Sequence, residues 1–122
     1  MYAQGDVLLL PVKAVKPPMT GVKLATPDDP VILAKGETTG HRHAFYNRVA
    51  MFRDDALARA AHVPETLYIG HVVVAPGGDV LEHGAAQGLA GDHDALTIPA
   101  GTYIARRQQE YPLRESARIV ND

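Results

Sequence analysis

Proline and glycine interrupt this chain of 122 residues at short intervals, and this punctuation limits its fold more than any other feature. Nine Pro and eleven Gly separate apolar runs that are too short for long helices. The runs recur about every ten residues and end in turn residues, which is typical of strands in an all-β domain. We therefore predict a single β domain over residues 1–122, built as a sandwich, jelly roll or small barrel. The expected strands are residues 7–12, 31–34, 41–49, 66–75, 80–83, 95–98 and a run from 102 toward 110.

Three segments carry more specific expectations. Residues 13–30 contain four prolines, which exclude a helix interior or a central strand, so we expect a long loop there. Residues 54–61 (DDALARAA) combine good helix formers with an acidic first turn, and Pro64 would end this short helix. The strand at 7–12 is nearly continuous in apolar residues, which predicts burial on both of its faces.

Cysteine is absent, while the chain has six histidines. The absence of Cys excludes disulfides, Cys-type zinc fingers, iron–sulfur clusters and thiol catalysis, so any bound metal must be held by imidazole or carboxylate groups. The net charge of −2 predicts no nucleic-acid partner. No apolar run is long enough to cross a bilayer, so we expect a soluble, cytoplasmic protein with no membrane partner.

His41 and His43 flank a single residue in the expected strand 41–49. Side chains two residues apart on a strand project from the same face, with Cβ atoms about 6–7 Å apart. At that separation both imidazoles can reach one metal ion. The motif therefore predicts two ligands of a metal site.

Two further histidines, His83 and His93, lie on either side of a loop rich in Gly and Ala, residues 84–91. The stretch from 60 to 105 has no Lys or Arg, so it would attract a cation. If the loop joins neighbouring strands, His83 and His93 face each other. The predicted ligands are His41, His43, His83 and His93, or three of them with a carboxylate, for a divalent transition metal such as Zn, Fe, Mn or Ni.

The last expected strand carries two more polar candidates, Gln108 and Glu110, on one face. Either is a possible ligand, general base or group that orients a histidine. The alternative is a solvated edge strand with Tyr111 packed at its end. We expect no role for His62, which follows the predicted helix, or for His71, in the strand 66–75.

Two motifs resemble the halves of the cupin signature: Gly36-x4-His41-x-His43 and Pro99-x-Gly101. The cupin motifs also contain a Glu after the His pair and a His after Pro-x-Gly. In this chain Asn47 and Arg48 stand in the place of the Glu, and Ile104 stands in the place of the His. The resemblance thus implies two of four cupin ligands, which His83 and His93 would have to complete.

The chain also resembles a group of short bacterial and phage proteins with no established activity. The shared motifs are Gln4-Gly5-Asp6-Val7-Leu8-Leu9, Gly36-Glu37-x-Thr39-Gly40-His41-x-His43, a late His93, Pro99-x-Gly101-x-Tyr103 and Arg107-Gln108-x-Glu110-Tyr111. They run along most of the chain. This resemblance supports the motifs without implying what they do.

Together these patterns predict a small metal-binding β domain with a histidine cluster. If the domain is catalytic, it is a cupin-like metalloenzyme whose metal acts on a small molecule as a Lewis acid or oxygen-binding centre. The alternative is a non-enzymatic, phage-related or bacterial β module for protein interaction or assembly. It would bind its protein partner through residues 13–30 and the C-terminal tail, and its histidines would be structural. The edges of a small sandwich need covering, so a homodimer is one expected form.

Overall fold

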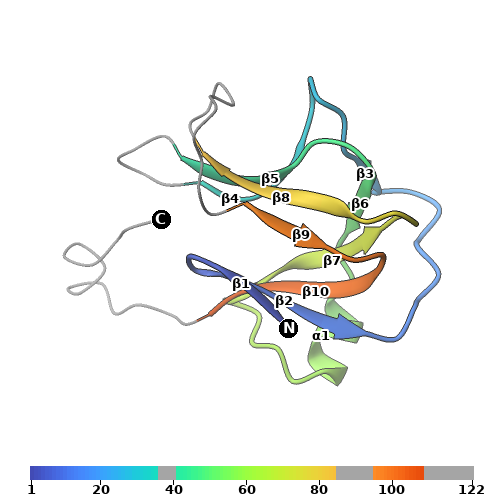
Figure 1. The fold of residues 1–122 in the computed structure, drawn as a ribbon. Coiled ribbons are helices and arrows are strands. Elements are labelled where there is room, and N and C mark those ends of the chain that lie inside the picture. The colour runs from blue at the N-terminus through green and yellow to red at the C-terminus, as the bar shows by residue number, and fades with distance from the viewer. Residues whose placement is uncertain (36–40, 85–94, 109–122) are drawn as a thin grey trace.

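The computed structural model describes residues 1–35, 41–84 and 95–108, and these residues form two antiparallel sheets that pack face to face (Figure 1). The elements in chain order are β1 (Tyr2–Gln4), β2 (Val7–Val12), β3 (Lys23–Leu24), β4 (Val31–Lys35), β5 (Arg42–Phe45), β6 (Val49–Phe52), α1 (Asp55–Ala60), β7 (Tyr68–Val74), β8 (Asp79–Gly84), β9 (Leu96–Ile98) and β10 (Gly101–Arg107). The six-stranded sheet has the order β1-β2-β10-β7-β6-β3, and the four-stranded sheet has the order β4-β5-β8-β9. The expected all-β class is confirmed, as an open sandwich rather than a closed barrel.

The core lies between the two sheets because the strands alternate. On β8, Asp79, Leu81 and His83 are buried, while the residues between them are exposed or half-buried. Burying one face of each sheet against the other removes apolar surface from water, which is the main favourable contribution to folding. The largest fully buried apolar side chains of this core are Val7, Leu9, Val31, Phe45, Val72, Leu81 and Ile98.

The single strand expected at 41–49 is wrong, because the chain changes sheets within it. β5 pairs with β4 and β8 in one sheet, and β6 pairs with β7 and β3 in the other. The crossing at Asn47 and Arg48 is held by hydrogen bonds to the β7–β8 turn. The backbone N–H of Arg48 donates to Asp79 Oδ2 at 3.0 Å, and its guanidinium donates to the carbonyl of Gly78 at 3.2 Å. Both Phe45 and Val49 can thereby enter the same core from opposite sheets.

β2 is not buried on both faces, as its apolar run had suggested. Val7 and Leu9 are fully buried between the sheets, whereas Leu8 and Leu10 are half-buried on the other face. The strand pairs with β1 through the turn at Gly5 and with β10 on its other side. The Pro-rich residues 13–30 contain one short strand, β3, at the other edge of this sheet. This position agrees with the expectation that the prolines exclude a central strand there.

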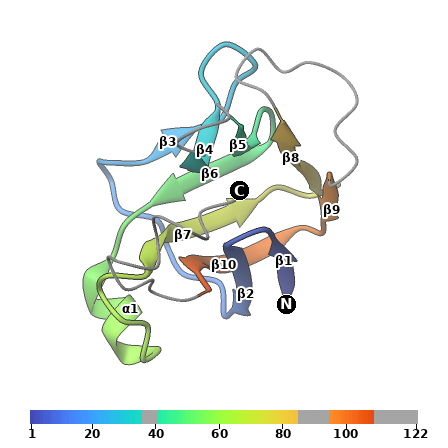
Figure 2. The same cartoon turned by 90° about the vertical axis from the view of Figure 1, so that its left-hand side faces the viewer.

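The helix expected at 54–61 is confirmed as α1, with Asp54 as its N-cap. The Asp54 carboxylate accepts a hydrogen bond from the N–H of Leu57 at 3.0 Å, which satisfies one of the donors that a helix N-terminus leaves open. α1 lies outside the sandwich, beside the six-stranded sheet (Figure 2). It packs there through Ala58 against Tyr68 and Ile104. Along the described ranges, no helix has the length and apolar character needed to span a membrane.

Candidate functional site

His43 and His83 lie opposite each other inside the sandwich. β5 and β8 pair with His43 directly across from His83, and the two residues are only 1% and 8% exposed. Strand alternation buries Phe45 and Leu81 on the same faces, so each histidine is flanked by an apolar neighbour two residues along its strand. The sequence had suggested that His83 faces His93. His93 lies outside the described residues, and the cross-strand neighbour that the structure gives His83 is His43.

The imidazoles of His41, His43 and His83 form one aromatic group. The rings of His43 and His83 are stacked, with centroids 4.1 Å apart and planes 11° apart. His41 lies just before β5 and is half-buried. Its ring meets that of His83 edge-on, with centroids 5.6 Å apart and an interplanar angle of 89°. The His-x-His motif thus brings both of its rings to the same third histidine.

Gln4, which the sequence analysis assigned no role, connects this group to the opposite sheet. It is the last residue of β1 and is 4% exposed. Its Oε1 lies 2.8 Å from Nδ1 of His43, and its Nε2 donates to the carbonyl oxygen of Leu81 at 2.9 Å. The signal that could have identified it is an amide side chain three residues before Val7, the first residue of β2. Only the sheet pairing reveals the distance to His43.

These two hydrogen bonds determine which ring nitrogen of His43 carries the proton. The Leu81 carbonyl can only accept, so it faces the NH₂ group of Gln4 and leaves Oε1 toward His43. Because Oε1 can only accept, the donor is the N–H at Nδ1 of His43. In the neutral ring the lone pair is then on Nε2, which is the arrangement that orients a histidine ligand or base through its other nitrogen.

The stacked rings are not arranged to share an ion as they stand. A metal lies close to the plane of each imidazole that binds it, so two parallel planes meet at one ion only after a ring turns. Consistent with this, no three His, Asp or Glu side chains form a metal-holding group within residues 1–35, 41–84 and 95–108. His41, His43 and His83 are nevertheless neighbours, with both other rings next to that of His83.

Gln108, expected to support a histidine, instead fastens the turn that follows Gln4. Its side-chain amide donates to the carbonyl of Gly5 at 2.6 Å, and its backbone N–H donates to the carbonyl of Asp6 at 2.8 Å. Beside it, the Arg107 guanidinium pairs with the Asp6 carboxylate at 2.9 Å. Gln108 therefore contacts the β1–β2 hairpin, the hairpin that carries Gln4. Glu110, the other supporting candidate, lies outside the described residues.

The second cupin-like motif, Pro99-x-Gly101, and the following Ile104 do not lie beside the histidine group. Pro99-x-Gly101 forms the turn between β9 and β10. Ile104, at the position of the last cupin His, is buried beside Ala58 and Val63 near α1. Its strand neighbours Tyr103 and Ala105 face the core between the sheets instead. Ile104 is thus on the outer face of the six-stranded sheet.

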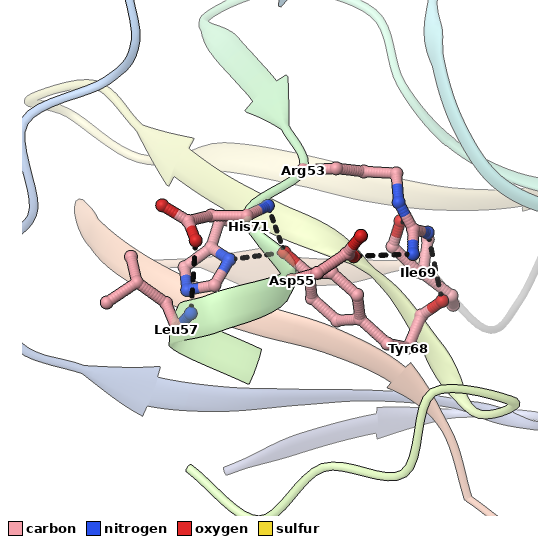
Figure 3. Close-up of polar contacts among 7 residues, drawn as sticks. Arg53, Asp55, Leu57, Tyr68, Ile69 and His71 are labelled. Atoms are coloured by element: carbon pink, nitrogen blue, oxygen red, sulfur yellow. Dashed lines mark hydrogen bonds and ion pairs between the residues drawn. The ribbon is translucent and has the colours of Figure 1, made fainter. Parts of the chain in front are cut away.

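A second buried polar group, also missed from the sequence, lies on that outer face (Figure 3). His71 on β7 is 1% exposed, and its Nδ1 is 2.6 Å from the hydroxyl of Tyr68. The backbone N–H of Asp54 donates to the same hydroxyl at 2.9 Å. Burial lowers the pKa of His71 below its ordinary value of 6.5, and the Asp54 carboxylate opposes this shift. His62, by contrast, is exposed with φ of 61°, beyond the end of α1.

Comparisons with known proteins identify the family to which the chain belongs. The family described as "Domain of unknown function (DUF8820)" matches residues 3–108, which include Gln4, His43, His71 and His83. No curated protein and no solved structure matches the chain significantly. Because the match covers most of its length, the chain is a member of the DUF8820 family.

Proposed function

We propose that this protein is a small metal-binding β domain whose ion is held by the histidines at the interior of the sandwich. The observation that carries the proposal is the hydrogen bond from Nδ1 of His43 to Gln4, because it directs the lone pair of a buried imidazole away from its partner. His83 and His41, which contact each other's rings, supply the neighbouring ligands. His93 is the fourth ligand in this proposal.

Imidazole ligands determine the class of metal. Nitrogen donors suit divalent transition ions such as Zn, Fe, Ni and Mn better than they suit Mg or Ca, which prefer oxygen. Three or four histidines leave room for water or a small molecule at the ion, so the domain would act as a cupin-like metalloenzyme on a small substrate, with the metal as Lewis acid or oxygen-binding centre. We place this activity in the cytoplasm, in keeping with the finding that no helix among the described residues can span a membrane.

Metal content of the untagged protein tests the proposal. We expect about one transition ion per chain after purification, or full binding on addition of one of the four metals to the chelated protein. A ligand at 100 times its Kd stabilises the native state by about 2.7 kcal/mol, which corresponds to a rise in Tm of about 10 °C or more for a domain of this size. His43→Gln should abolish both the stoichiometric metal and the rise in Tm.

His62→Asn is the matched control for that variant. His62 is exposed and has a positive φ that Asn tolerates, so its removal deletes one imidazole without touching the interior group. It should leave metal content and the Tm shift unchanged. Equal loss in both variants would mean adventitious surface binding, and no binding of any of the four metals to the native chain would refute the proposal.

The exposed Met19 and Leu24 favour a second candidate function, a protein-binding module. Both lie within the Pro-rich residues 13–30, and they are 100% and 66% exposed. Large apolar side chains that are this exposed contribute more to a partner surface than to the monomer. Light scattering during size exclusion distinguishes the candidates. A homodimer or a co-purified partner that is lost in the double variant Met19→Ser/Leu24→Ser but kept in His43→Gln supports the module.

A further inference from the structure

The hydroxyl of Tyr68 links the start of α1 to the buried His71, and its hydrogen bonds can be counted. It accepts the backbone N–H of Asp54 at 2.9 Å and lies 2.6 Å from Nδ1 of His71. A phenol has one proton to donate, and when neutral His71 carries its own proton on Nε2, Nδ1 accepts the proton of the phenol. Asp54, whose backbone N–H donates to the Tyr68 hydroxyl, is the N-cap of α1.

The surroundings of His71 disfavour a charge on its ring. Its register partners on the two neighbouring strands, Phe52 on β6 and Ile104 on β10, are both apolar and buried. Phe52 stacks on the imidazole with centroids 5.4 Å apart and planes 14° apart. A buried cation between such neighbours loses its hydration, which is why burial lowers the pKa of His71.

The charged groups near this pair come from the segment that begins α1. The Asp54 carboxylate favours protonation of His71, but it is already engaged as acceptor for the N–H of the first helical turn. Asp55 pairs with Arg53, whose guanidinium carbon lies 4.6 Å from the Tyr68 ring centroid. Arg53 also donates to the backbone carbonyl of Tyr68, so it holds the phenol in place whatever the charge of His71.

We propose that Tyr68 and His71 form a proton-controlled latch, which holds the start of α1 on the six-stranded sheet while His71 is neutral and releases it when His71 is protonated. A protonated ring must donate from Nδ1, so Tyr68 loses the acceptor of its own proton. The phenol proton is then left without its acceptor, while the N–H groups of both His71 and Asp54 point at the same oxygen. The conflict is relieved when the segment that carries Asp54 moves away. This inference is independent of the proposed metal site, which lies between the sheets.

The sign of the pH dependence follows from the lowered pKa of His71. Above pH 6.5 the imidazole is neutral in both the latched and the released state, so the latch has its full strength. Below pH 6.5 the released state takes up a proton that the latched state resists. Between the ordinary and the lowered pKa, the opening equilibrium rises about tenfold for each pH unit.

Amide hydrogen exchange of the native protein, followed by NMR between about pH 5 and 7, tests this latch. The reporter is the N–H of Leu57, which bonds to Asp54, and the reference is that of Val72 in the central strand β7. After correction for intrinsic exchange, we expect Leu57 protection to fall by up to about tenfold per pH unit below pH 6.5, with no matching change at Val72. A Leu57 protection factor that is flat across this range would overturn the proposal.

Two variants assign the effect to these side chains. His71→Asn keeps an acceptor for the phenol near Nδ1 but does not titrate, so Leu57 should stay protected at both ends of the range. Tyr68→Phe removes the relay and keeps the ring under Arg53, so protection should be low and independent of pH. An unchanged pH dependence in either variant would assign it to another group and refute the latch.

The wild-type protein supplies a measurement that does not require a folded variant. The ¹⁵N shifts of the His71 ring at pH 7 should show a bare Nδ1 and a protonated Nε2. A proton on Nδ1 at this pH would contradict the direction of the Tyr68 hydrogen bond and with it the latch.

Discussion

Oε1 of Gln4, on the edge strand β1, lies 2.8 Å from Nδ1 of His43, on β5 of the opposite sheet. The two residues are 39 positions apart in the chain. The bond therefore joins the two sheets through polar atoms within their largely apolar core. It orients His43 and attaches the N-terminal hairpin to the histidine group.

Gln4→Met should destabilise the protein and release the ring of His43. Methionine has a similar volume but removes two buried hydrogen bonds, so we expect the free energy of unfolding to fall by about 1–3 kcal/mol. The ¹⁵N spectrum of His43 should change from one with Nδ1 protonated to a mixture of tautomers. Gln108→Met, which removes an exposed amide contact of the same hairpin, should cost about 0.5 kcal/mol or less. If both variants cost the same, the buried amide has no special role.

Substitutions at Gly78 and Gly21 separate the cost of backbone strain from the cost of a steric clash. Their φ values are +75° and +77°, so alanine is strained by a similar amount at both, roughly 1–2 kcal/mol. A Cβ on Gly78 would lie 2.8 Å from the backbone carbonyl oxygen of Ile98, whereas a Cβ on Gly21 meets nothing within 4 Å. Gly78→Ala should therefore cost a further 1–3 kcal/mol or so in urea denaturation. Equal losses of stability in the two variants would show that the β7–β8 turn shifts at no cost to avoid the clash.

Phe45→Ala tests how much of the stability resides between the sheets. Phe45 has no exposed surface and follows His43 on the same face of β5. Truncation of a buried Phe leaves a cavity and typically costs about 3–5 kcal/mol. Leu24→Ala, at a residue 66% exposed on an edge strand, should cost about 0.5 kcal/mol or less. Chemical denaturation of both variants with unchanged m-values provides the measurement, and a loss below that range at Phe45 would contradict the described core.

Tyr103→Phe should weaken the dependence of stability on alkaline pH. Burial, and secondarily Tyr2, raise the pKa of Tyr103 above its ordinary value of 10.0. Below pH 10 the phenol is neutral in both folded and unfolded chains, so its contribution is constant. Above pH 10 the unfolded chain loses the proton first, so stability falls as pH rises toward the folded pKa.

The slope of the urea midpoint between about pH 9 and 11 is the measurement for this variant. Tyr103→Phe also loses the hydrogen bond to the carbonyl of Pro99, which shifts the midpoint at every pH but not the slope. An equally steep decline in the variant would mean that Tyr103 does not titrate differently in the folded state.

Much of the local structure was predictable because its signals are local. The β-branched residues of 66–75 and the turn at Gly77 and Gly78 predicted β7 and β8, and the structure confirms both. The acidic start of 54–61 and the stop at Pro64 predicted α1. The break between β5 and β6 was missed because the apolar residues on both sides of Asn47 enter the same core, so hydrophobicity does not change where the chain changes sheets.

The sequence by itself determined the all-β class and most strand positions, because the two-residue period of a strand is a property of neighbouring residues. Only the tertiary structure decided that His83 stacks on His43, that Gln4 orients it, and that Tyr68 and His71 lie beneath the cap of α1. Which strands pair depends on how both sheets bury their faces together. No single segment of the sequence therefore indicates which strands will pair.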